Sequence, residues 1–185
     1  MFIQYLYVLK INYFMLKKLF FFLSLIIVTT NFYAQQTADY TSKLVDYNMA
    51  FHLYNNHQYL AAQSLFTNII NTSVDENIKS KSAYYSAISA VQLNQKNADQ
   101  LIKLFLNEYP TSVNQKSAYL NLANYYFLNE NYTDALNWYV MVDEQSLSTA
   151  KKNSFNFNKG YSFFQNKQYD QAKIYFNKLL DSSND

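Results

Sequence analysis

The sequence predicts an all-helical protein made of about four antiparallel helix pairs, and three observations carry this prediction. The 185 residues include one Gly and one Pro, so the many turns of a β-sandwich, a barrel or an α/β fold are not encoded. Half of the residues are apolar, which is enough to close a core in a chain of one domain's length. Aromatic and alanine residues also recur at a nearly constant spacing that matches the size of a helix pair.

The N-terminal residues 1–34 have the layout of a secretory signal peptide. Two lysines at positions 17 and 18 precede an apolar run over residues 19–28, and a cleavage point follows Ala34. We expect residues 1–14 to be a mis-assigned upstream start. The apolar run is shorter than the roughly 20 residues that a membrane-spanning helix takes. A retained membrane anchor is the alternative.

The charge of the chain gives no basis for nucleic-acid binding. All fifteen basic residues are Lys, whereas nucleic-acid grooves usually recruit Arg for its bidentate hydrogen bonds. Removal of residues 1–34 takes away three lysines and no acidic residue, which changes the formal net charge from +2 to −1. The chain has no cysteine, so disulfides, thiolate zinc sites and a lipid-modified N-terminal cysteine are excluded.

One short motif recurs through the rest of the chain: an aromatic residue, an alanine three positions later, and a second aromatic residue four positions after that. The copies are Tyr59-Ala62-Phe66, Tyr132-Ala135-Tyr139, Tyr169-Ala172-Phe176 and a degenerate copy with Ala98 and Ile102. Successive alanines are 36, 37 and 37 residues apart. Each motif follows a helical stretch that has its own small residue, at Ala50, Ala87, Ala123 or Gly160.

Apolar residues at helical spacing predict the first helix of a pair, most clearly over residues 117–128 and 153–165. Brief polar segments predict the turn to the second helix. These turns are expected at 55–57, 94–97, 129–131 and 165–167. We therefore expect an array over residues 38–185, with approximate repeats at 40–73, 77–110, 113–146 and 150–183.

This pattern of small residues between paired helices and aromatic residues around them resembles the tetratricopeptide repeat. The ending Leu106-Asn107-Glu108-Tyr109-Pro110 is similar to exported bacterial members of the TolA-binding and outer-membrane-assembly type. The resemblance covers residues 40–182 and implies a right-handed α-solenoid that follows the signal segment. The chain departs from the family in repeats longer than the usual length of about 34 residues and in its missing prolines.

In such an array the first helix of every pair lines a concave groove, which the resemblance makes the binding site for a partner segment. The groove residues implied are Leu44, Tyr47, Phe51, Tyr54, Tyr84, Ile88, Val91, Leu120, Asn124, Phe127, Phe157, Tyr161 and Phe164. An aromatic groove suits an apolar or amphipathic peptide, with Tyr hydroxyls forming hydrogen bonds at its rim. The alternative is that most of these rings pack between repeats.

Residues for catalysis or metal binding are not arranged as those chemistries require. His52 and His57 are five positions apart, which places them on different faces of a helix. The acidic pairs at 75–76 and 143–144 are expected at helix boundaries, where the first pair would stabilise a helix start. A nucleophile elbow or a phosphate-binding loop needs glycines that the chain lacks. We predict no enzymatic activity, no cofactor and no metal site.

The sequence thus predicts an exported scaffold in the periplasm or at the outer membrane, which binds proteins of an envelope complex. It would contact the membrane only through the N-terminal segment or its partners. One alternative is a glycan-binding protein that stacks sugar rings on groove aromatics, for which Trp138 fluorescence would report. Another is a membrane-anchored assembly subunit. The chain stops after the second helix of the fourth repeat without a polar capping helix, so we expect a longer array or a partner that covers this end.

Overall fold

The computed structural model describes residues 15, 17–21 and 41–182, and most of the predicted signal segment lies outside these residues. The chain divides into two compact units, Met1–Val45 and Asp46–Asp185. The described residues of the first unit are helical and largely exposed. Within the described residues, no helix combines the length and the apolar character that crossing a membrane requires.

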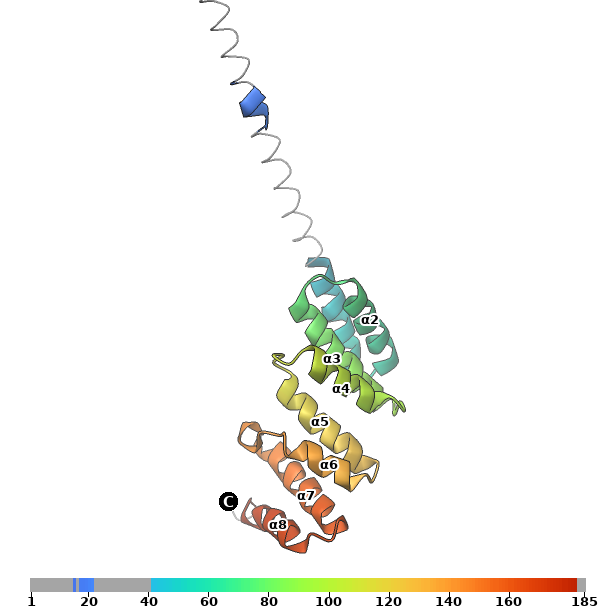
Figure 1. Ribbon diagram of the computed structural model, residues 1–185. Helices are drawn as coiled ribbons and strands as arrows, with labels where there is room; N and C mark the ends of the chain where they lie inside the picture. The colour runs from blue at the N-terminus through green and yellow to red at the C-terminus, as the bar shows by residue number, and fades with distance from the viewer. Residues whose placement is uncertain (1–14, 16, 22–40, 183–185) are drawn as a thin grey trace, which may run out of the picture. The chain divides into compact units, whose positions relative to one another are not determined.

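Every regular element in the described residues is a helix, as the composition predicts. The second unit begins within a helix over residues 41–55 and continues with α2 (Tyr59–Thr72), α3 (Glu76–Gln92), α4 (Ala98–Glu108), α5 (Gln115–Leu128), α6 (Tyr132–Tyr139), the 3₁₀ helix η1 (Glu144–Ser146), α7 (Thr149–Gln165) and α8 (Tyr169–Ser182). Figure 1 shows α2 to α8 following one another in chain order along the unit.

The helices of the second unit form four pairs: residues 46–55 with α2, α3 with α4, α5 with α6, and α7 with α8. Each of α2 to α7 packs against the next α-helix in sequence, and α5 also contacts α3 and α7. The alanines of the repeated motif are all buried at Ala62, Ala98, Ala135 and Ala172. Their counterparts on the first helices are buried too, at Ala50, Ala87, Ala123 and Gly160. Small residues therefore lie where the paired helices approach closely, as predicted.

Gly160 shows how close this approach is. A Cβ atom added at Gly160 would lie 2.9 Å from Cε1 of Phe176 and 3.1 Å from Cβ of Tyr175 on α8. The second distance involves an atom fixed to the backbone, so α7 and α8 would have to separate slightly to admit any side chain. The φ angle of Gly160 is not positive, so its backbone conformation does not require a glycine. The close packing of α7 on α8 therefore explains why the single glycine of the chain is at this position.

The turn within each pair is closed by a residue in the left-handed region that is not glycine. These residues are His57, Asn94, Glu130 and Lys167, with φ values of 59°, 53°, 59° and 60°. At each one, two backbone N–H groups donate to carbonyls of the preceding helix; the amide of Lys167 donates to Phe164 and that of Gln168 to Phe163, both at 2.9 Å. This pattern satisfies carbonyls that a helix end leaves without partners.

The four turn residues fix the register of the repeat. Successive turn residues are 37, 36 and 37 positions apart, and each lies seven residues after the small residue of its first helix. The motif alanine follows five residues later in three pairs, but only four after Asn94. The one-residue shortening of the second repeat therefore lies between the turn residue and α4.

We expect that Lys167→Gly stabilises the protein by about 1 kcal/mol. Glycine adopts a positive φ without the steric cost that a Cβ imposes, and the Lys167 side chain is exposed. Asn94→Gly is the matched control with a smaller expected gain, because Asn tolerates this region better than Lys. Urea unfolding followed by circular dichroism measures both, and an equal gain at the two positions would contradict the explanation.

Candidate interaction groove

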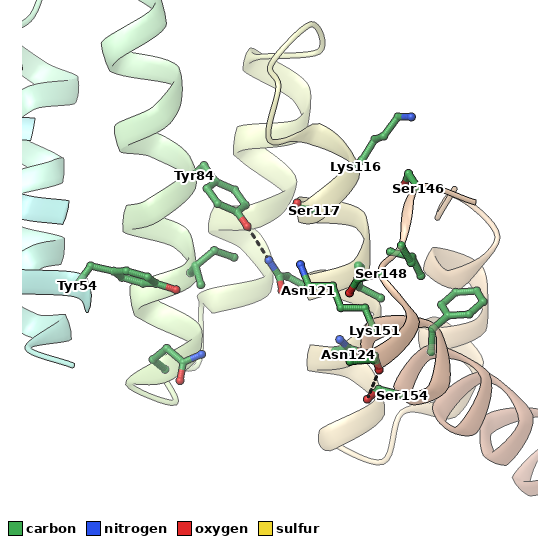
Figure 2. Close-up of a pocket in the computed structure, with 16 residues that line it drawn as sticks. Tyr54, Tyr84, Lys116, Ser117, Asn121, Asn124, Ser146, Ser148, Lys151 and Ser154 are labelled. Carbon is green, nitrogen blue, oxygen red and sulfur yellow. Dashed lines mark hydrogen bonds between the residues drawn. The ribbon is translucent and has the colours of Figure 1, made fainter. Parts of the chain in front are cut away.

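A groove of about 690 Å³ runs across the first helices of the second, third and fourth pairs. It is formed by α3, α5, the start of α7 and the loop around η1, with Tyr54 of the first pair at one side (Figure 2). Its lining consists of Tyr54, Tyr84, Ile88, Gln92, Lys116, Ser117, Leu120, Asn121, Asn124, Ser146, Leu147, Ser148, Ala150, Lys151, Ser154 and Phe155. Helical spacing places Ser117, Leu120 and Asn124 on one face of α5, which explains why they line it together.

The groove combines an apolar base with polar side chains. Tyr84 and Phe155 are buried, whereas Lys116, Lys151 and Ser154 are exposed. Figure 2 shows Asn121 beside Tyr84, and the amide nitrogen of Asn121 donates a hydrogen bond of 3.0 Å to the Tyr84 hydroxyl. A groove of this kind can bind an extended or helical segment through apolar contacts and orient it through hydrogen bonds.

The charge of the groove comes from lysine alone, since no acidic residue lines it. Lys116 forms an ion pair of 2.7 Å with Asp143, which lies outside the lining. Lys151 lies on the first turns of α7 and is exposed. The groove is therefore neutral to weakly positive, which favours a partner segment with a carboxylate or carbonyl oxygen near Lys151.

Burial, together with the neighbouring Tyr85 and Tyr54 hydroxyls, raises the pKa of Tyr84 to about 12. The hydrogen bond from Asn121 acts against this shift. Tyr84 is therefore a neutral phenol at physiological pH. It takes part in recognition as a hydrogen-bonding group and not as an anion.

The structure places only some of the predicted groove residues in the groove. Tyr54, Tyr84, Ile88, Leu120 and Asn124 line the groove. Tyr47 and Phe51 instead pack on Tyr85 between the first two pairs, with ring centroids 6.5 Å and 5.0 Å from it.

The predicted residues of the fourth pair lie elsewhere. Phe157, Tyr161 and Phe164 form a separate row of rings along α7, and the ring centroid of Tyr161 lies 5.9 Å from that of Phe127. Val91 packs against the core, and Leu44 belongs to the first unit.

Asn124 has a structural role besides its place in the groove. Its Oδ1 accepts a hydrogen bond of 2.7 Å from the Tyr139 hydroxyl and one of 3.2 Å from the amide of Asn158. This oxygen therefore links α5 to α6 and α7, and the two hydrogen bonds occupy both of its lone pairs. Only the amide nitrogen of Asn124 is left to serve a ligand.

Several lining residues were not among the sequence candidates. Ser117 and Asn121 share a helical face with Leu120, so the periodicity that selected Leu120 could have selected them as well. The residues from Ser146 to Ser148 could not be found this way, because their position depends on the path of the loop between α6 and α7. That path is held in part by an ion pair of 2.7 Å between Lys178 and Glu144.

A second cavity of about 710 Å³ lies beside α4, α5 and α6 and contains Trp138. Trp138 stacks on Tyr119 with their ring centroids 6.2 Å apart. Nearby, Asp99 accepts hydrogen bonds of 3.0 Å from Lys103 and 2.8 Å from the Tyr126 hydroxyl. Trp138 does not line the groove, so its fluorescence would report on this second cavity and not directly on a groove ligand.

The residues considered for catalysis have structural partners. His52 interacts with Asn56, and Nδ1 of His57 lies 2.6 Å from the Tyr59 hydroxyl at the turn. Asp75 caps the start of α3 by accepting from the backbone N–H of Ile78 at 2.7 Å, which agrees with the helix-start role predicted for the first acidic pair. Within the described residues, no three His, Asp or Glu side chains are grouped as a metal ion would need.

Asp143 and Glu144 are likewise accounted for by structure. Asp143 caps η1 by accepting from the backbone N–H of Gln145, and it pairs with Lys116. The Lys116 ammonium, by its hydrogen bond, holds the pKa of Asp143 below its ordinary value. A carboxylate held in its ionised form by a lysine is unsuited to act as a general acid at neutral pH.

Fold and groove together define a helical repeat protein, and the comparisons with known proteins agree. The family model described as "Tetratricopeptide repeat" matches residues 154–185, so one such repeat is detected at the fourth pair. Among solved structures, the chain is similar to "MamA 41-end from Desulfovibrio magneticus RS-1", with a TM-score of 0.61 and 15% identity. That match covers 77% of this chain and 76% of the other. A comparison with curated proteins found no match.

The chain thus has a tetratricopeptide-like helical repeat fold, as its repeated motif predicts. The likeness to MamA covers 77% of the chain, whereas the family model matches only the last pair. The fourth pair contains the aromatic-alanine-aromatic motif at 169, 172 and 176 together with a small residue at 160. The second pair has lost the second aromatic residue of the motif.

Proposed function

We propose that this protein is a non-enzymatic scaffold of the bacterial cell envelope that binds a segment of a partner protein in the groove of α3, α5 and α7. A tetratricopeptide-like fold supports protein–protein interaction as the general function. The observation that carries the finer proposal is the groove itself, with Tyr84 and Leu120 at its base and lysine at its rim. The expected ligand is an amphipathic segment with apolar side chains and at least one acidic side chain.

The envelope location rests on the signal-like segment of residues 1–34. Export and cleavage after Ala34 would place the array in the periplasm or at the outer membrane. Cell fractionation followed by N-terminal sequencing tests this part alone. A chain recovered from the cytoplasm with its N-terminus intact would contradict it without bearing on the groove.

The groove is tested by site-specific photocrosslinking in cells. A photoreactive phenylalanine at Lys151, which is exposed at the groove, is expected to give a discrete crosslinked protein that mass spectrometry identifies. The same group at Asn137, which is exposed on α6 beside the second cavity, is the matched control and should not give that product. Ser154→Trp fills the groove from an exposed position, so it should abolish the Lys151 product.

Two outcomes would contradict this proposal. A product that forms equally from positions 137 and 151 would show contact without a defined groove. A Lys151 product that persists unchanged in Ser154→Trp would show that the partner passes outside the groove. Circular dichroism of each variant verifies that the helices are retained.

A further inference from the structure

The aromatic residues of the first helix pair recur in the fourth pair, 110 residues further along the chain. The corresponding residues are Tyr47 and Phe157, Phe51 and Tyr161, Tyr54 and Phe164, and Phe66 and Phe176. Their arrangement recurs as well, since the centroids of Tyr47 and Phe51 are 6.1 Å apart and those of Phe157 and Tyr161 are 6.0 Å apart. We call Phe157, Tyr161, Phe164 and Phe176 the C-terminal aromatic face.

In the first pair these rings are covered by the second pair. The ring of Tyr85 on α3 lies 5.0 Å from Phe51, 5.1 Å from Tyr54 and 5.7 Å from Phe66. In the fourth pair, the described residues include no such cover. Phe157 is 49% exposed and Phe164 is 48% exposed.

The covering position is the same at each junction between pairs. Tyr85, Asn121 and Asn158 each lie nine residues before the turn residue of their own pair. Asn121 donates to the Tyr84 hydroxyl, and Asn158 donates to Oδ1 of Asn124 at 3.2 Å. The array therefore repeats one interface, in which the first helix of a pair packs on the exposed side of the pair before it.

The first pair presents its own copy of this covering surface to solvent. Asn48 occupies the position of Asn121 and Asn158, and it is exposed. The next residue, Met49, is 59% exposed. Its counterparts Ser86, Leu122 and Lys159 are all buried, and the Ser86 hydroxyl lies 3.3 Å from that of Thr67 in the preceding pair. We call Asn48, Met49 and His52 the N-terminal face.

We propose that two copies of this chain pack head to tail, with the N-terminal face of one copy on the C-terminal aromatic face of the other. The internal interfaces supply the template, because both halves of an interface that the chain forms between its own pairs are exposed in the second unit. Met49 occupies the register of the buried Leu122, and an Asn at the covering position is used in two of the three internal interfaces.

Such a contact is heterologous, since it joins two different surfaces. Each added copy presents a fresh aromatic face, so the contact builds linear assemblies unless its rotation closes a ring. This inference goes beyond the scaffold function proposed above and does not depend on it. None of the residues in the two faces lines the groove, so each copy in an assembly keeps its own groove available.

Sedimentation velocity of the full chain over a wide concentration range tests the proposal. The wild-type chain is expected to form species that grow with concentration beyond a dimer. Phe164→Glu and Met49→Glu should each weaken association by at least about tenfold, because an unpaired carboxylate would have to leave water for an apolar interface. Leu104→Glu, which replaces an exposed apolar residue on α4 outside both faces, is the matched control and should associate like wild type.

The decisive measurement is a mixture of the two impaired variants. Phe164→Glu keeps an intact N-terminal face and Met49→Glu keeps an intact aromatic face, so the mixture should form a 1:1 dimer and no larger species. A wild-type chain that stays monomeric would overturn the proposal. Association that both substitutions leave unchanged would also overturn it, because contacts through the N-terminal segment would give that result. A mixture of the two variants that forms no dimer would overturn it as well.

Discussion

Replacement of Phe66 by alanine is expected to lower the free energy of unfolding of the first two helix pairs by about 3–5 kcal/mol. Phe66 is completely buried, and its ring lies among Tyr47, Tyr85 and the small residues Ala50 and Ala62. Alanine would remove the apolar surface and leave a cavity that rings in contact on several sides cannot easily close. The loss is large because this ring contacts both the first pair and the cover supplied by α3.

Because each pair contacts mainly its neighbours, the effect of this substitution should be local. Trp138 belongs to the third pair, so its fluorescence reports on the far part of the array. In urea, the circular dichroism transition of Phe66→Ala should begin at lower denaturant than that of wild type, while the Trp138 transition moves much less. Equal shifts of both signals would show that the array unfolds as one unit and would contradict this expectation.

Phe176→Ala is the matched control, since Phe176 occupies the same position in the fourth pair. Its side chain is only partly buried, and it contacts Phe157 at a centroid distance of 6.5 Å without a covering ring from a further pair. The expected loss is therefore smaller, about 1–2 kcal/mol. If Phe176→Ala lowered the free energy of unfolding of the monomer as much as Phe66→Ala does, the C-terminal aromatic face would be more completely packed than its exposure indicates.

The helical class and the repeat could be predicted from the sequence because both depend on local pattern. The alanines at 62, 98, 135 and 172 are buried as their spacing predicts, and the polar turns occur where they were expected. The left-handed conformation of Glu130 and Lys167 was not predictable, because neither residue favours it. The closing hydrogen bonds of the turn impose it, and these depend on the helix that precedes them.

Whether an aromatic residue is packed between pairs or lines the groove could not be predicted, because this depends on the side chain that the next pair places over it. The covering residue is the large Tyr85 at the first junction, where it lies over Tyr47 and Phe51. At the next two junctions it is an asparagine, which fills less space. The groove accordingly begins at Tyr54 and Tyr84 and runs over α5 and α7. One aromatic pattern in sequence therefore yields packed rings at one junction and a groove at the others.

The protein is also expected to lose stability steeply between about pH 10 and pH 12. A buried tyrosine resists ionisation, so it stays protonated in the folded chain over a pH range in which the unfolded chain has already lost that proton. Burial raises the pKa of Tyr84 to about 12 from an ordinary value of 10.0. The stabilisation linked to Tyr84 is fully present below pH 10 and is lost as the pH rises towards 12.

For Tyr84 alone, which is almost fully buried, this loss is about 3 kcal/mol at 25 °C. Burial also raises the pKa of Tyr139, whose hydroxyl donates to Asn124, and that of Tyr47 to about 12, so both act in the same direction. Lys103 contributes with the same sign, because hydrogen bonds from its ammonium to Tyr126 and Asp99 raise its pKa, but its exposure makes the effect small.

Urea unfolding at a series of pH values measures this loss, and the absorbance of tyrosinate in the folded chain follows the ionisation directly. Tyr84→Phe isolates one residue: it should flatten the fall in stability between pH 10 and pH 12 by about 3 kcal/mol. Because the raised pKa of Tyr84 arises from its burial between α3 and α5, folded chains whose tyrosines all ionise near pH 10 would show that these helices do not pack as described.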